Sequence, residues 1–310
     1  MANAIINVGS TGGQVNISTA TAPATPAVGV VTLYAGTDKA LHVKNSDGTD
    51  ITIAAASAAS PITVQQTNSL VSTAVGATAT AAGSIVIGAT ACSTALNTVT
   101  IGSCAKSVNA GDIAIGQNAC TTAGAGGLSI GKNVCSVGSI SRAIAIGENV
   151  CATTRGFGIG YNVSSTGDGS VGFGLTICAS AESAVAIGGD AYATANWAIA
   201  IGRIVCATAT SSIAVGLNAC STAACGIALG NSSCATAANT ISIGNAAKST
   251  AACAITMGSA STIFPGATGT IVLGNSSNGG TGACNSVVIG NSACTRNLGS
   301  IIIGQEAKDV

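Results

Sequence analysis

The feature that most constrains this chain is a short phrase ending in glycine that recurs from Ser84 to Gly304. In its first copy the phrase reads Ser-Ile-Val-Ile-Gly. The closing glycine occurs sixteen times, at intervals of 13 to 16 residues that are mostly 14, as Gly88, Gly102, Gly116, Gly131, Gly147, Gly160, Gly174, Gly188, Gly202, Gly216, Gly230, Gly244, Gly258, Gly274, Gly290 and Gly304. A fixed period of this size predicts a solenoid, in which each repeat contacts only its neighbours.

Each phrase alternates in the manner of a β-strand. Counted from the closing glycine, positions −3 and −1 hold a large apolar residue in all sixteen copies, and position −2 is usually small, as in Ala186 and Ala200. Large-small-large with a period of two is typical of a strand. We expect the large side chains to fill the interior of the coil and the small ones to face a neighbouring chain or solvent. The glycine predicts a sharp turn with positive φ.

A second strand and two corners complete the repeat. Position +2 is often asparagine, as in Asn118 and Asn133, which tolerates left-handed backbone at a corner. A short second strand follows, and a corner rich in Ala, Ser, Gly and Asn returns the chain to the next phrase. We therefore predict an all-β fold, a parallel β-roll of about sixteen coils that spans ~75 Å at about 4.8 Å per coil. Because so thin a roll has a marginal core, we expect several chains to associate.

The first 83 residues differ from the repeat. Residues 1–26 suggest an extended arm or a short strand around Ile5-Ile6-Asn7-Val8. Residues 30–34, 41–44 and 51–53 read as three strands joined by turns, a small β-meander. We assign residues 1–66 to an attachment region, residues 67–83 to a neck or connector, and residues 84–310 to the repetitive roll.

Composition excludes several classes of protein. Ten basic and ten acidic residues give no net charge, and no basic cluster is present to neutralise the phosphates of a nucleic acid. Only 6% of residues are charged and 2% aromatic, whereas the mean hydropathy of +0.59 argues against disorder. No apolar run is long enough for a membrane-spanning helix. Residues 1–10 do not read as a secretory signal, so we expect folding without export.

The repeats resemble those of a known family. Ser-Ile-Val-Ile-Gly, Ala-Val-Ala-Ile-Gly at residues 184–188 and Ser-Val-Val-Ile-Gly at residues 286–290 look like the Ser-Val-Ala-Ile-Gly repeats of YadA-like trimeric autotransporter adhesin heads. The resemblance covers about 220 residues. It implies a left-handed parallel β-roll in a side-by-side homotrimer. Those adhesins also carry an export signal and a membrane β-barrel anchor, which we do not find here, and their repeats lack the cysteines described next.

The most unusual feature is a column of cysteines at position +4. The column comprises Cys92, Cys120, Cys135, Cys151, Cys178, Cys206, Cys220, Cys234 and Cys294. Thiols stacked along one face do not form a tetrahedral metal site, and His42 is the single histidine. Disulfides between successive coils are an alternative that parallel Cβ vectors would strain. The simplest interpretation is that cysteine fills a small apolar slot. Since Lys106 and Lys248 occupy the same slot, it must open to solvent.

Two further sets of residues suggest binding. Threonine at position +6 in nine coils resembles the arrays of ice-binding solenoids, but the column is interrupted. Tyr161, Tyr192, Trp197 and Arg203 form a candidate receptor patch for a sugar or a protein, with an irregular surface as the alternative. One histidine and dispersed carboxylates do not assemble a catalytic site, and the glycines do not precede a helix as phosphate loops do. We predict no enzyme activity, no cofactor and no metal.

Taken together, these features predict a structural protein of a virion, assembled in the host cytoplasm and exposed on the particle surface. We expect a trimeric bacteriophage tail or neck fibre, or a head-decorating spike, docked on another virion protein through residues 1–66 and able to contact a host glycan or protein. A cell-surface trimeric adhesin head that binds host matrix or glycans is the second candidate. An ice-binding or scaffold solenoid is the third.

Overall fold

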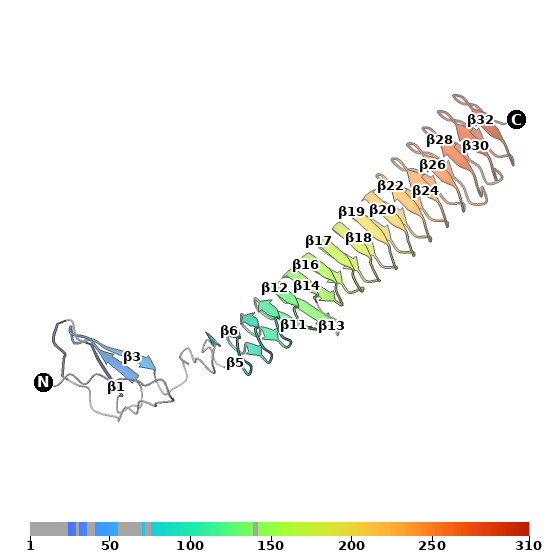
Figure 1. The fold of residues 1–310 in the computed structure, drawn as a ribbon. Coiled ribbons are helices and arrows are strands. Elements are labelled where there is room, and N and C mark those ends of the chain that lie inside the picture. The colour runs from blue at the N-terminus through green and yellow to red at the C-terminus, as the bar shows by residue number, and fades with distance from the viewer. Residues whose placement is uncertain are drawn as a thin grey trace.

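The computed structural model describes residues 24–28, 31–35, 41–54, 70–71, 76–138 and 142–309. Every regular element in these ranges is a β-strand (Figure 1). The arm predicted within residues 1–26 falls almost entirely outside the described residues. Close to the N-terminus, β1 (Thr32–Ala35) pairs antiparallel with β2 (Leu41–Lys44), and β2 pairs antiparallel with β3 (Asp50–Ala54).

The remainder is a parallel β-solenoid, as the period predicts. Each coil contributes a first strand before the closing glycine and a second strand after it. The first strands are β6 (Ile85–Ile87), β8 (Val99–Ile101), β10 (Ile113–Ile115), β12 (Leu128–Lys132), β14 (Ile144–Glu148), β20 (Ile213–Leu217), β22 (Ile227–Leu229), β24 (Ile241–Ile243), β26 (Ile255–Met257), β28 (Ile271–Leu273), β30 (Val287–Ile289) and β32 (Ile301–Ile303).

The second strands lie across the coil from the first. They are β7 (Cys92–Ser93), β9 (Lys106–Ser107), β11 (Cys120–Ala123), β13 (Cys135–Gly138), β15 (Cys151–Thr153), β21 (Cys220–Ser221), β23 (Cys234–Ala235), β25 (Lys248–Ser249), β27 (Thr262–Ile263), β29 (Asn278–Gly279) and β31 (Cys294–Thr295). In the middle of the shaft, single nine-residue strands run through the glycine corner and supply both: β16 (Phe157–Ser165), β17 (Val171–Ala179), β18 (Val185–Ala193) and β19 (Ile199–Ala207).

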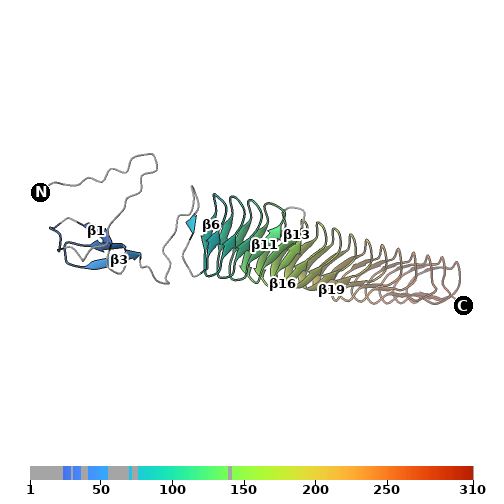
Figure 2. The same cartoon turned by 90° about the horizontal axis from the view of Figure 1, so that it is seen from below.

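Successive coils pair in register along the whole shaft (Figures 1 and 2). Between β18 and β19, for example, Ala186 lies opposite Ala200 and Gly188 opposite Gly202. The roll also begins earlier than expected. β4 (Leu70–Val71) pairs with β6, and β5 (Thr78–Ala79) pairs with β7, so the segment interpreted as a neck contributes one more coil.

The structure reverses the predicted orientation of the first strand. The small residue at position −2 faces the interior and is fully buried in most coils, as Ala114, Ala186 and Ala200 are. The large residues at −3 and −1 point outward and are only partly buried. The physical reason is space: the second strand also turns small residues inward, such as Ala191 and Ala193, so the two strands approach closely. No room remains inside for two isoleucines per coil.

Interior volume is balanced across the coil. In two coils where position +3 carries a larger side chain, Val163 and Ile177, position −2 is a glycine. A Cβ added to Gly158 would lie 2.9 Å from Val150 Cγ1, and one added to Gly172 would lie 2.9 Å from Val163 Cγ1 and 3.2 Å from Ile177 Cγ2. Such compensation keeps the interior close-packed, as protein cores generally are.

The corner after each closing glycine depends on close contact between backbones. All sixteen closing glycines have φ between +127° and +148°. In all but the last, an added Cβ would overlap the carbonyl of the corresponding glycine in the next coil. Two residues later every coil has a left-handed residue, with φ of +52° to +58°. Four asparagines at this position form a ladder. Asn118, Asn133 and Asn149 each donate a side-chain hydrogen bond of 2.9–3.1 Å to the asparagine of the next coil, and the ladder ends at Asn162.

The second corner absorbs the variation in repeat length. A left-handed residue stands five positions before each closing glycine, as Asn97, Ser183 and Trp197 do. The strands on either side stay in register even across the 16-residue interval that ends at Gly274. Insertions and deletions therefore change the loop of this corner and leave the core untouched.

The glycine corner yields a direct test. Replacing Gly188 with alanine imposes a side chain on φ of +127° and drives its Cβ into the backbone of the next coil. We expect a loss of about 3 kcal/mol or more, seen as a melting midpoint lowered by at least about 5 °C in circular dichroism. Gly189→Ala is the matched control, since its Cβ would meet only Arg203 Cγ, at 3.8 Å. Equal midpoints for the two variants would contradict this account of the corner.

Candidate functional site

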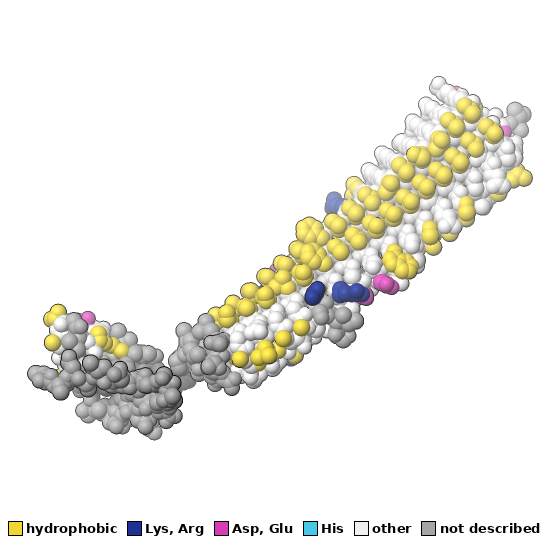
Figure 3. Space-filling view, in the orientation of Figure 1, with side chains coloured by type: hydrophobic (Ala, Val, Ile, Leu, Met, Phe, Trp, Pro, Cys, Tyr) yellow, Lys and Arg dark blue, Asp and Glu magenta, His cyan; other side chains and the backbone are white. Residues whose placement is uncertain are grey.

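The outward side chains of the first strands form one continuous apolar face. Positions −3 and −1 carry Ile, Val, Leu, Phe or Met in every coil, and neighbouring coils bring these residues into contact in register, as Ile187 and Ile201 are. Figure 3 shows a continuous band of hydrophobic side chains along the shaft. Some members are highly exposed: Phe173 is 50% exposed and Met257 42%. We call this surface the aliphatic face.

The size of the aliphatic face matters for its role. Sixteen coils at about 4.8 Å make it ~75 Å long, and residues two apart on a strand lie about 7 Å from each other, so it covers on the order of 500 Å². The largest apolar patches on typical monomers are about 300–600 Å² and are often functional. The aliphatic face lies in the upper part of that range and repeats regularly from coil to coil.

The cysteine column lies on the outer face of the second strands. Within it, Cys120, Cys135 and Cys151 face one another in successive coils. A second run comprises Cys206, Cys220 and Cys234. All nine thiols of the column are free and half-buried. The disulfides considered as an alternative are not formed, and the slot opens to the outside, as Lys106 and Lys248 had indicated.

The first run contains thiols of very different acidity. The Cys135 side chain hydrogen-bonds the sulfurs on both sides and lowers the pKa of Cys120 and of Cys151 to about 7. The ammonium of Lys106 contributes to the shift at Cys120. Cys135 keeps its own proton, because its hydrogen bonds to both neighbours and its burial raise its pKa. Cys120 and Cys151 are therefore the nucleophilic thiols of this column near neutral pH.

In the second run burial acts in the opposite direction. Desolvation, together with the neighbouring thiols Cys234 and Cys206, raises the pKa of Cys220 to about 11. Burial also raises the pKa of Cys206. Cys206 and Cys220 therefore remain protonated at neutral pH and act as small apolar side chains, which is the simpler interpretation offered for the column.

The four residues of the candidate receptor patch do not lie together. Tyr161 and Arg203 share the column directly after the closing glycine, but two coils lie between them. Tyr192 stands in the cysteine column on the second strand. Trp197 occupies the second corner, which follows that strand, whereas Tyr161 and Arg203 lie at the glycine corner. All four are exposed. The structure thus offers Tyr161 and Arg203 along one edge and gives no single surface that holds all four.

Several coils in the middle of the shaft carry a large apolar side chain at the glycine corner, a feature that the sequence predictions do not include. At positions +1 and +2, where most coils carry polar or small residues, Leu175, Ile204 and Leu217 are exposed at 53%, 50% and 40%. Leu175 lies opposite Tyr161, but the next coil carries Gly189 and Asp190 at these positions. The signal was available in the sequence, since positions +1 and +2 carry Tyr, Leu or Ile only in this part of the shaft. Leu175 and Leu217 each follow a residue of the aliphatic face by two positions on the same strand, so they extend that face toward the corner.

Ion pairs and metal ligands are sparse. Among the residues that the structure describes, Lys132 pairs with Glu148 at 3.3 Å, and Arg155 pairs with Asp168. Over the same ranges no three His, Cys, Asp or Glu side chains come close enough to hold a metal ion together. None of the described residues belongs to a helix that could cross a membrane.

The chain matches no known protein-family model and no curated protein sequence.

The acidity of the thiols can be measured. At pH 7 about half of a thiol of pKa about 7 is present as thiolate, whereas only about 10⁻⁴ of a thiol of pKa about 11 is. Because a more acidic thiol forms a less nucleophilic thiolate, we expect its rate of alkylation to exceed that of the less acidic thiol by about 100-fold rather than by the full ratio of thiolate. We therefore expect iodoacetamide to alkylate Cys120 and Cys151 about 100 times faster than Cys220, as followed by peptide mass spectrometry. The rate at Cys120 should rise with pH to half its maximum near pH 7.

Replacing the central thiol provides the control. Cys135→Val removes the hydrogen bond, so alkylation of Cys120 at pH 7 should slow while that of Cys220 stays unchanged. If iodoacetamide alkylates Cys135 in the unmodified protein as fast as Cys120, the assignment of a protonated Cys135 between two ionised neighbours is wrong.

Proposed function

We propose that this protein is a structural shaft whose chains associate through the aliphatic face into a rigid trimeric rod. The observation that carries the proposal is the outward position of the large residues at −3 and −1 along the full length of the roll. An apolar surface of this extent gains stability when another chain removes it from water, at about 25 cal/mol per Å². The trimer is the assembly that the resemblance to YadA-like heads implies.

Mechanical rigidity follows from the same arrangement. In-register parallel ladders run along the shaft on both faces of the coil. Bending the rod would strain many backbone hydrogen bonds at once, and packing three coils side by side would stiffen it further. Few charged residues interrupt the aliphatic face. A soluble partner would therefore find polar groups to bind mainly at the corners and on the second-strand face of the rod.

We place the rod in a bacteriophage fibre or head-decorating spike, with residues 1–66 attached to another virion protein. A cell-surface trimeric adhesin head is the alternative setting, because the same rod would also hold a binding tip away from a cell. The two are distinguished by whether an antibody against the shaft labels purified virus particles or a bacterial envelope.

The oligomeric state tests the central claim. Light scattering should give a particle of three times the chain mass of 29.2 kDa. Ile187→Glu with Ile201→Glu places six carboxylates in the proposed interface of a trimer, where each loses several kcal/mol of hydration. We expect this variant to be a monomer that keeps its β-sheet circular dichroism.

A matched pair of substitutions on the other face serves as the control. Thr194→Glu with Thr208→Glu lies in the same two coils but at exposed positions directly after β18 and β19, and this variant should remain a trimer. A monomeric wild-type protein would overturn the proposal, and so would a trimer that withstands the isoleucine substitutions.

A further inference from the structure

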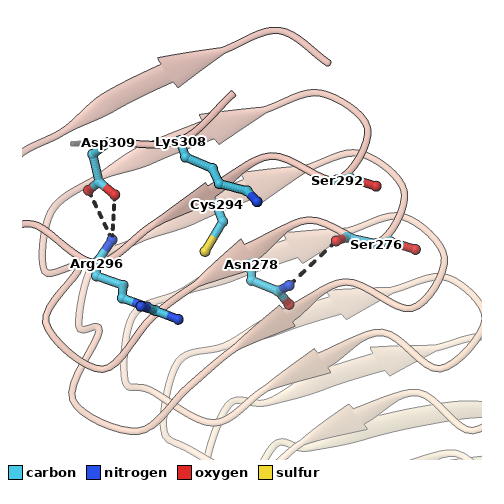
Figure 4. A pocket seen from close by; sticks show the side chains of 7 residues that line it. All are labelled: Ser276, Asn278, Ser292, Cys294, Arg296, Lys308 and Asp309. Carbon is cyan, nitrogen blue, oxygen red and sulfur yellow. Dashed lines mark hydrogen bonds between the residues drawn. The ribbon is translucent and has the colours of Figure 1, made fainter. Parts of the chain in front are cut away.

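A polar groove crosses the outer face of the second strands near the C-terminal end of the shaft. Its volume is about 470 Å³, within the range of roughly 300–1,000 Å³ found for small-molecule sites. Figure 4 shows its lining side chains, which are Ser276, Asn278, Ser292, Cys294, Arg296, Lys308 and Asp309.

The regular stacking of coils assembles this groove. Asn278, Cys294 and Lys308 stand opposite one another in three successive coils, in the column that holds cysteine elsewhere. Ser276 and Ser292 occupy the left-handed corner position of two of these coils, with φ of +54° and +56°. The groove thus presents hydroxyls at one side, an amide and an ammonium along the middle, and the guanidinium of Arg296 at the other side.

Arg296 lies across the preceding coil because Gly280 leaves room for it. A Cβ added to Gly280 would come within 2.8 Å of Arg296 Cγ and 3.0 Å of the Thr295 carbonyl oxygen. Gly280 is buried beneath this side chain, whereas most coils carry a threonine or another side chain at the same position. The local sequence therefore seats the arginine against the sheet.

The two cations of the groove remain available to a ligand. Asp309, the one acidic residue of the lining, accepts a hydrogen bond from the Thr295 hydroxyl and bonds of 2.9 Å from the backbone N–H groups of Arg296 and Asn297. These hydrogen bonds, the one from Thr295 above all, lower the pKa of Asp309 and hold its carboxylate on the backbone. Among the described residues, no carboxylate lies within ion-pair distance of the Arg296 guanidinium or the Lys308 ammonium.

We propose that this groove binds an anionic saccharide unit, one that carries a carboxylate or a sulfate group. The guanidinium and the ammonium supply charge-assisted hydrogen bonds to the anion. The serine hydroxyls and the Asn278 amide both donate and accept, as the hydroxyls of a sugar ring require. The groove is larger than a bare inorganic anion needs, and its only apolar lining atoms of note belong to Cys294, which disfavours the side chains of a peptide.

The site does not depend on the trimer. It lies on the second-strand face, opposite to the aliphatic face, and every lining residue comes from one chain. Loss of trimerisation would therefore leave the groove intact, so the test below and the test of the assembly can fail independently.

The test is ligand-observed saturation-transfer NMR on the full chain, with glucuronate, glucose 6-sulfate, glucose and inorganic sulfate as probes. For a monosaccharide of this size we expect a Kd of about 1 mM. Saturation should reach the ring protons of glucuronate, of glucose 6-sulfate or of both, which distinguishes a carboxylate site from a sulfate site. Glucose should show at least about tenfold less transfer, and 1 M NaCl should weaken binding of the charged sugars.

Three variants locate the site. Arg296→Gln with Lys308→Gln should weaken binding at least about tenfold, and Asn278→Asp should weaken it by placing a negative charge in the groove while both cations remain. Lys248→Gln, in the same column but outside the groove, should bind as the unmodified protein does. Equal binding of glucose, undiminished binding by the Asn278→Asp variant, binding of inorganic sulfate without the charged sugars, or preference for a glutamate-rich peptide over glucuronate would each overturn the proposal.

Discussion

Contact between glycine backbones in successive coils is the constraint from which the rest of this structure follows. At the first corner of nearly every coil, the glycine lies so close to the carbonyl of its counterpart that no side chain fits between them. This contact fixes the register, since a slip of one residue would bring a Cβ into the gap. Once the register is fixed, equivalent residues stack automatically. The asparagine ladder, the cysteine runs and the aliphatic face are all consequences of it.

The narrow interior has an equally direct consequence for the surface. Two strands that approach this closely can enclose only Ala, Ser, Thr, Val or Gly in most coils, and where the larger Ile177 points inward, Gly172 faces it. The chain nevertheless carries two large apolar side chains per coil, and these must lie outside. A conventional globular domain gains most of its stability from such residues in its own core. Here these residues lie on the surface, and we propose that the gain comes when another chain covers the aliphatic face.

Much of the architecture could be predicted from the sequence, but the inside of the coil could not. The glycine period revealed the solenoid, and asparagine at position +2 revealed its left-handed corner, because both residue types report on backbone conformation. Alternation along a strand, in contrast, defines two faces without saying which is buried. Comparing both strands would have resolved it: positions +3 and +5 are as small as position −2, as Ala191, Ala193 and Ala186 are. All three can face one another only if the isoleucines point outward.

The candidate sites were harder to predict for a related reason. The four residues of the proposed receptor patch lie close in sequence and in or near corners, yet Tyr161 and Trp197 belong to opposite corners of the coil. The groove, by comparison, draws on three coils and on Gly280, whose importance appears only when Arg296 is seen above it.

In a solenoid the inward positions are determined by packing, so the outward positions carry the specific information, and they carry it where they depart from the repeat. Lys308 and Asn278 stand where cysteine is usual, and Arg296 stands where threonine is usual. Such departures cost the fold little, because the slots they occupy already open to solvent. A site can therefore arise on this shaft by a few substitutions in adjacent coils, with the backbone ladder keeping its side chains at a fixed spacing.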